Sequence, residues 1–178
     1  MKKLTFFFLV FAHIHLSAQD MKLIDSLKSV LDQNLSNKKR ANTHNLIAQA
    51  ARETDSALVA FHVNEALKIA RANDLWEEIA DAYHQIAYAT LEKGYHAIAD
   101  SLYNIELKTS LENEYVSGEA SAYLGLGLVR SRQSEFDKSN QYYDKALTIY
   151  RRLEDSGNIA SCLTNMAINS FYSGKPNE

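Results

Sequence analysis

The chain has few residues of the kinds that interrupt helices. Its 178 residues include a single proline, Pro176, and six glycines, so few positions impose a turn. A β-rich fold needs such residues at short intervals, and their scarcity argues against one. Hydrophobic residues make up 46% of the chain, which is enough for a packed core. We therefore predict one domain of long helices.

Cysteine is scarce as well, and the chain has no excess of positive charge. Cys162 is the only cysteine, so the fold contains no internal disulfide bond. We interpret it as a small buried side chain, because no paired base is indicated that would make it a catalytic thiol. The net charge is −3, without the polybasic signature of nucleic-acid-binding proteins. We predict no nucleic-acid partner for this chain.

Residues 1–19 have the pattern of a signal peptide. Lys2 and Lys3 form a short basic region, residues 4–16 are mostly apolar, and residues 17–19 resemble a cleavage site. The apolar run is shorter than the roughly 20 residues that span a bilayer. We predict export to the periplasm, with no membrane contact beyond this leader. An uncleaved membrane anchor is the alternative.

The rest of the chain repeats at intervals of forty residues. The clearest unit covers residues 120–153 and reads as two helices separated by a turn near 133–135. A shift of forty residues brings its residues onto others of the same class: Tyr123 onto Tyr83, Leu126 onto Ile86, Gly127 onto Ala87 and Tyr143 onto Tyr103. Such matching in one register predicts stacked helical hairpins. A glycine at position 127 suggests that another helix approaches closely there.

These positions resemble the tetratricopeptide repeat, whose helix–turn–helix unit follows the pattern W-x2-L-G-x2-Y, then A-x3-F. The matching residues are Tyr123, Leu126, Gly127, Tyr143 and Ala146. The chain departs from the pattern at Arg130 and Ser139, and its period is forty rather than about 34 residues. The resemblance implies an all-α solenoid of helical hairpins, wound as a right-handed superhelix, with about three and a half repeats.

This interpretation divides the chain after the leader into two parts. Residues 20–37 are expected to form an N-terminal capping helix, and residues 38–178 the repeat domain. The repeats are expected at about 40–73, 80–113 and 120–153, with a partial repeat at 157–178. Ser134 with Asp137, and Asp74 with Glu77, resemble capping boxes that would start new helices. The partial repeat favours a fragment of a longer protein over a final capping helix.

A binding surface is a better prediction than an active site. The chain lacks the phosphate-binding loop, the nucleophile elbow and the zinc-protease motif. We therefore predict no enzymatic activity, no cofactor and no metal site. An enzyme that uses His84 or Cys162 would be the alternative, but no constellation supports it.

The family resemblance places a ligand groove along the first helices of the hairpins. The corresponding residues are His44, Ala48, Arg52, His84, Tyr88, Leu91, Leu124, Leu128, Arg132, Thr164 and Ile168. This stripe is apolar with a few polar groups, as expected for an extended peptide or a partner helix. Packing against neighbouring helices is the alternative for each residue. The Lys, Asn and Arg of the family's terminal-carboxylate clamp are absent from the matching positions, which argues against that class of partner.

The leader, the capping helix and the repeats together are similar to the periplasmic input region of certain bacterial, Bacteroidetes-like signalling proteins. The resemblance implies an exported module that binds a protein or peptide and belongs to a longer signal-transduction protein. A stand-alone periplasmic scaffold for envelope assembly is the alternative. Self-association stays open.

Overall fold

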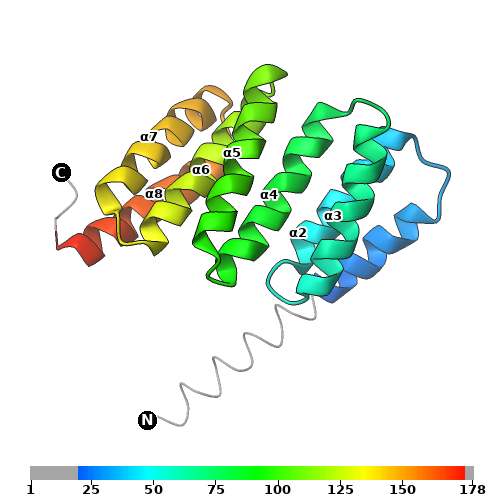
Figure 1. The fold of residues 1–178 in the computed structure, drawn as a ribbon, viewed down its shortest axis with the longest axis horizontal. Helices are drawn as coiled ribbons and strands as arrows, with labels where there is room; N and C mark the ends of the chain where they lie inside the picture. The colour runs from blue at the N-terminus through cyan, green and yellow to red at the C-terminus, as the bar shows by residue number, and fades with distance from the viewer. Residues whose placement is uncertain (1–19, 175–178) are drawn as a thin grey trace, which may run out of the picture.

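The computed structural model describes residues 20–174, which form helices joined by short turns and contain no strand (Figure 1). The predicted signal peptide lies outside the described residues. A first helix covers residues 20–31. It is followed by α2 (Asn37–Ala51), α3 (Ser56–Arg71), α4 (Trp76–Glu92), α5 (His96–Glu112), α6 (Val116–Arg132), α7 (Phe136–Arg152) and α8 (Ser156–Ser173). The predicted all-α class is confirmed.

The helices follow one another as hairpins along the long axis of the molecule, from α2 and α3 at one end to α7 and α8 at the other (Figure 1). Each helix packs against the next, and α2–α4, α4–α6 and α6–α8 also pack. Among the helices between residues 37 and 173, α3–α5 and α5–α7 make no such contact. The first helices of the hairpins are therefore closer together than the second helices. The stack curves, with α2, α4, α6 and α8 on its inner side, which confirms the predicted repeat solenoid.

The forty-residue period consists of two halves of twenty residues. From α3 onward the helices begin at 56, 76, 96, 116, 136 and 156. The repeats thus begin about four residues before the predicted starts at 80 and 120. The first hairpin begins at Asn37, about three residues before the predicted start at 40.

A left-handed residue ends most of these helices. Asp74, Glu114, Ser134 and Glu154 have φ between 49° and 61°, and Gly94 has φ 81°. The residue after each of them donates its N–H to a carbonyl five positions earlier, at 2.8–3.2 Å. This is the Schellman motif, which satisfies carbonyls at a helix end.

The two predicted capping boxes are therefore wrong. Asp74 and Ser134 are the left-handed residues that end α3 and α6. Each lies one position before the true N-cap, which is Leu75 for α4 and Glu135 for α7, and neither N-cap makes a side-chain capping bond. Side-chain capping bonds occur instead at α2, α3 and α8. Ser36 accepts from the N–H of Lys39, Asp55 from those of Ala57 and Leu58, and Asp155 from that of Asn158.

Glycines allow the close helix contacts that the sequence suggested. A Cβ at Gly127 would overlap the ring of Tyr143 in α7. A Cβ at Gly125 would overlap the ring of Tyr103 in α5, so the preceding hairpin docks on the same helix. Both tyrosines are fully buried. Both glycines are therefore packing positions, and the close approach predicted at Gly127 is confirmed.

The N-terminal helix, at residues 20–31 rather than the whole of 20–37, packs on the first hairpin. Ile24 is buried in a cluster that includes Ile47 and Val63. Arg40 donates from Nη1 to the Leu31 carbonyl at 3.1 Å and from Nη2 to the Gln33 carbonyl at 3.3 Å. The end of the first helix is thereby tied to the start of α2.

At the other end, Asn169 fixes α8 to the stack. This fully buried side chain accepts from Ser131 Oγ at 2.7 Å and donates to Ser139 Oγ and Asn140 Oδ1, each at 2.8 Å. The opposite side of α8 exposes apolar side chains, of which Phe171 is 81% exposed. None of the helices between residues 20 and 174 combines the length and apolarity needed to cross a bilayer.

Candidate functional site

A groove with a volume of about 500 Å³ lies on the inner side of the stack, and all four inner helices contribute to it. We call it the inner groove. Its lining residues are Gln49 from α2 and Arg52 at the C-cap of that helix, Asp81, His84, Gln85 and Tyr88 from α4, Ser117, Ser121, Leu124, Leu128 and Arg132 from α6, Tyr150 from α7, Asn158, Ser161 and Asn165 from α8, and Tyr115 from the turn before α6.

The structure brings together most of the residues predicted for the groove. Those that line it are Arg52, His84, Tyr88, Leu124, Leu128 and Arg132. Two others belong to the core: Ala48 is completely buried and Leu91 is 2% exposed. Leu91 packs with Ala87 and Tyr103, because the contact between α4 and α5 turns it away from the groove.

The last three predicted residues also lie elsewhere. His44 is buried against His62, with the two Nδ1 atoms 2.8 Å apart. Thr164 and Ile168 are exposed on α8 but do not line the groove. The groove ends instead at Ser161 and Asn165 of the same helix.

Sequence reasoning missed the polar residues of the groove. Asp81, Ser121 and Ser161 are forty residues apart and all line it. A search for polar residues that recur at the repeat period could have found this row. Gln85 was not predicted as a lining residue either, although it follows Asp81 by one helical turn.

The centre of the groove contains a buried charged pair. Glu106 of α5 is completely buried at a position where the repeat expects a small residue. Its two carboxylate oxygens lie 3.1 Å from His84 Nδ1, and Oε1 accepts from Ser121 Oγ at 2.6 Å. Burial lowers the pKa of His84, but the charge of Glu106 and the hydrogen bond to it outweigh burial and raise that pKa overall. The pair therefore compensates its own charge.

This cluster does not have the geometry of a catalytic triad. In a triad, the histidine contacts the nucleophile through one ring nitrogen and the acid through the other. Here Ser121 Oγ lies 2.8 Å from His84 Nδ1, the same atom that contacts Glu106. One nitrogen cannot carry a proton from the hydroxyl to the far side of the ring, so the arrangement is structural.

Asp81 lies one turn before His84 in α4 and has a different environment. Its Oδ1 accepts from Tyr115 Oη at 3.1 Å. Burial is the main cause that raises the pKa of Asp81 to about 6, and the nearby charge of Glu106 acts in the same direction. None of the ion pairs within residues 20–174 includes Asp81.

Arginines occupy the other end of the groove. The Arg52 guanidinium lies 4.2 Å from the centre of the Tyr88 ring, a cation–π contact. Arg132 Nη2 lies 2.6 Å from Glu92 Oε1. Along α4, Tyr88 is two helical turns from Asp81, a rise of about 10 Å. The groove thus has an acidic end and a basic end.

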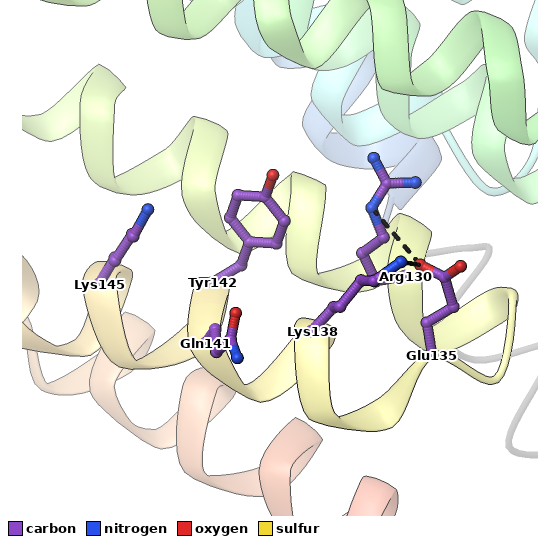
Figure 2. A pocket seen from close by; sticks show the side chains of 6 residues that line it. All are labelled: Arg130, Glu135, Lys138, Gln141, Tyr142 and Lys145. Carbon is purple, nitrogen blue, oxygen red and sulfur yellow. Dashed lines mark hydrogen bonds and ion pairs between the residues drawn. The ribbon is translucent and has the colours of Figure 1, made fainter.

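A second pocket, of about 380 Å³, lies between α6 and α7. Figure 2 shows Arg130 and Lys138 both turned toward Glu135, while Lys145 stands apart beyond Tyr142. Lys138 Nζ is 3.2 Å from Glu135, and Arg130 pairs with Asp100 at 2.6 Å. The Lys145 ammonium lies over the Tyr123 and Tyr142 rings. Because these charges are already satisfied within the fold, we consider the inner groove the better candidate.

The cysteine and the possible metal ligands do not form a second candidate site in the described part of the chain. Cys162 is completely buried, which raises the pKa of its thiol to about 11, and the interpretation as a packing residue is confirmed. Within residues 20–174, no group of three or more His, Cys, Asp or Glu side chains could hold a metal ion.

Comparison with known families gives one match. Residues 118–178 match the family model described as "Tetratricopeptide repeat", a region that includes nearly all of α6 and the whole of α7 and α8. None of the curated proteins matches the chain.

Proposed function

We propose that this chain, whose residues 118–178 match the tetratricopeptide-repeat family model, is a repeat module of that family and binds a protein or peptide segment in the inner groove. Repeats of this family generally mediate protein–protein interaction and are non-catalytic. The observation that carries the proposal is the groove itself. It combines the half-buried apolar side chains of Leu124 and Leu128 with polar groups such as Gln85 Oε1, which has no hydrogen-bond partner within residues 20–174.

Binding to displayed random peptides tests this function. The double variant Leu124→Glu, Leu128→Glu places two charges in the groove. Because both leucines pack on the edges of buried clusters, circular dichroism must first show that the variant is folded. The matched control is Ile105→Glu, Leu111→Glu, at exposed positions of α5 outside the groove. Peptides selected on the unchanged chain should lose binding to the first variant and keep it with the control. Equal binding to both variants would place the interaction on another surface.

We propose further that the module is exported and forms the input part of a longer bacterial signalling protein. Its support is the basic and apolar leader of residues 1–19, after which the first helix begins at residue 20. Fusion of residues 1–19 to alkaline phosphatase, which is active only outside the cytoplasm, tests the export. Replacing Lys2 and Lys3 with Glu should lower the activity of the fusion. An inactive fusion with the unchanged leader would reject export.

A further inference from the structure

Most of the charged side chains in and around the inner groove have a partner within the fold, but one does not. At the centre of the groove, Glu106 is compensated by His84 and Ser121. At the basic end, Arg132 is paired with Glu92, and Arg52 stacks on Tyr88. Only at the acidic end does a carboxylate, Asp81, lack a basic partner among the described residues.

The cations near Asp81 in the part of the chain that the structure describes are already engaged by other carboxylates. The charge of His84 lowers the pKa of Asp81, but His84 is paired with Glu106 at 3.1 Å. Lys38, whose charge is felt by Asp81, holds Glu77 at 2.7 Å and Glu78 at 3.8 Å. The two groove arginines lie near the other end of α4. A half-buried carboxylate without a cation is unfavourable for the free protein, because burial removes water without replacing it by an opposite charge. A cation supplied from outside would relieve this.

The surroundings of Asp81 offer further acceptors. Gln85 follows it by one turn on the same face of α4, lines the groove and is 7% exposed. Its Oε1 is one of the buried side-chain atoms that have no hydrogen-bond partner among residues 20–174. The hydroxyl of Ser117 also lines the groove, and that of Ser121 lies next to it at the centre, one helical turn further along α6. A guanidinium has five donors and an ammonium three, so both suit a carboxylate that is accompanied by an amide and hydroxyls.

We infer that the acidic end of the inner groove, formed by Asp81 and Gln85, receives the side chain of a Lys or Arg of the bound segment. The inference rests on the proposed function, since it names the chemistry of the partner in the same groove. It is opposite in sign to a terminal-carboxylate clamp, in which basic groove residues hold an acidic group.

Peptides selected from a displayed random library on the unchanged chain give the first test. Those that compete with one another for the groove should be enriched in Lys or Arg at one aligned position. This readout needs no variant of the protein. Groove-dependent peptides without such enrichment would overturn the inference and leave the proposed function standing. If no selected peptide depended on Leu124 and Leu128, the proposed function itself would fail.

A double-mutant cycle then tests the contact. Asp81→Asn should weaken binding of a selected peptide by roughly tenfold or more, and replacing the peptide's basic residue with Gln should do the same. The two changes together should cost little more than either alone. Asp144→Asn, an equal change of charge at an exposed position of α7, should leave the affinity unchanged. Independent, multiplying effects of the two changes would overturn the contact.

A free amine could satisfy the same chemistry, so spermidine is measured as a separate probe. The inference predicts that millimolar spermidine competes only weakly with the peptide, because it lacks the contacts along the rest of the groove. Binding of spermidine as tight as that of the peptide would assign the acidic end to polyamines and reject a peptide side chain.

Discussion

The ring of Tyr143 packs directly on the backbone of Gly127, so that α7 and α6 are separated there by no side chain of the inner helix. Tyr103, forty residues earlier, packs in the same manner on Gly125 of α6. The two tyrosines therefore hold α6 between α5 and α7. This contact sets the helix spacing on which the inner groove depends.

A side chain at position 127 should destabilise the fold. Gly127→Ala places a methyl group against the buried Tyr143 ring, which has no room to withdraw, and Gly127→Leu adds still more volume. We expect the alanine variant to lose about 1–3 kcal/mol of unfolding free energy, and the leucine variant more. Urea denaturation followed by circular dichroism measures both.

Gly157→Ala is the matched control for this change. Gly157 is exposed in the first turn of α8, where a Cβ would lie 3.5 Å from Asp155 Oδ1, an ordinary contact. Alanine there should be neutral or stabilising, because it has the higher helix propensity. If Gly127→Ala behaved like Gly157→Ala, the close contact between Gly127 and Tyr143 would be refuted.

Substitutions at the left-handed helix ends should change the stability of the fold in opposite directions. Ser134 has φ 61°. Ser134→Gly should raise the unfolding free energy by up to about 1 kcal/mol, since glycine adopts this conformation without a Cβ clash. Gly94 has φ 81°, and a Cβ added there would meet no atom within 4 Å. Gly94→Ala therefore tests the backbone conformation alone and should lose a similar amount of stability. Thermal melting of the two variants measures the shifts, and a stabilising Gly94→Ala would contradict the assigned turn.

Much of this fold was accessible from the sequence, because packing leaves a periodic trace. The forty-residue shift of Tyr103 and Tyr143 and the glycine at 127 identified the hairpins and the close contact. The helix ends were not accessible in the same way. Ser134 suits both an N-cap and a left-handed position, and only the backbone bond from Glu135 to the Arg130 carbonyl decides between them.

The candidate site was predicted less completely than the fold. Leu124 and Leu128, predicted from the family's inner-helix positions, line the inner groove, and their role in binding stays a prediction. In α2 the groove is lined by Gln49 rather than Ala48, a difference of one residue that rotates a side chain by about 100°. The contact between Glu106 of α5 and His84 could not be predicted from the sequence, because it depends on how α5 packs against α4.

The histidine pair of the first hairpin predicts a loss of stability in acid. One of His44 and His62 donates to the other, so at most one can be charged without breaking the bond. Burial, helped by the charge of His44, lowers the pKa of His62 to about 4, and burial lowers that of His44. Below pH 6.5 these two histidines therefore bind more protons in the unfolded chain than in the folded chain. The contribution of the pair to the unfolding free energy falls as the pH decreases from 6.5 to about 4.

The test is a comparison with His62→Phe, because Asp81 and His84 have raised pKa values and contribute stability in the opposite direction. As the pH falls from 7 to 4, the unchanged chain should lose up to about 3 kcal/mol of unfolding free energy relative to the variant. His96→Gln, at the start of α5, is the control. A difference that did not vary with pH would remove the histidine pair as its cause.

The buried Asn169 should control how firmly α8 is attached. Asn169→Leu keeps the volume but removes the bonds to Ser131, Ser139 and Asn140, at an expected loss of about 1–3 kcal/mol. Hydrogen exchange should become faster in α8 while α4 and α5 keep their protection. Thr164→Ala, exposed on the same helix, should change neither. Unaltered exchange in the Asn169 variant would show that apolar packing alone holds α8.

The most direct test of binding in the inner groove is to locate a bound peptide by NMR. A selected peptide is titrated into the isotopically labelled chain, and the changes in chemical shift are mapped onto the structure. We predict that the largest changes occur at residues that line the inner groove, including His84, Leu124 and Leu128. Changes concentrated instead on the exposed side of α8, or around Tyr142 and Lys145 on α7, would contradict binding in the inner groove.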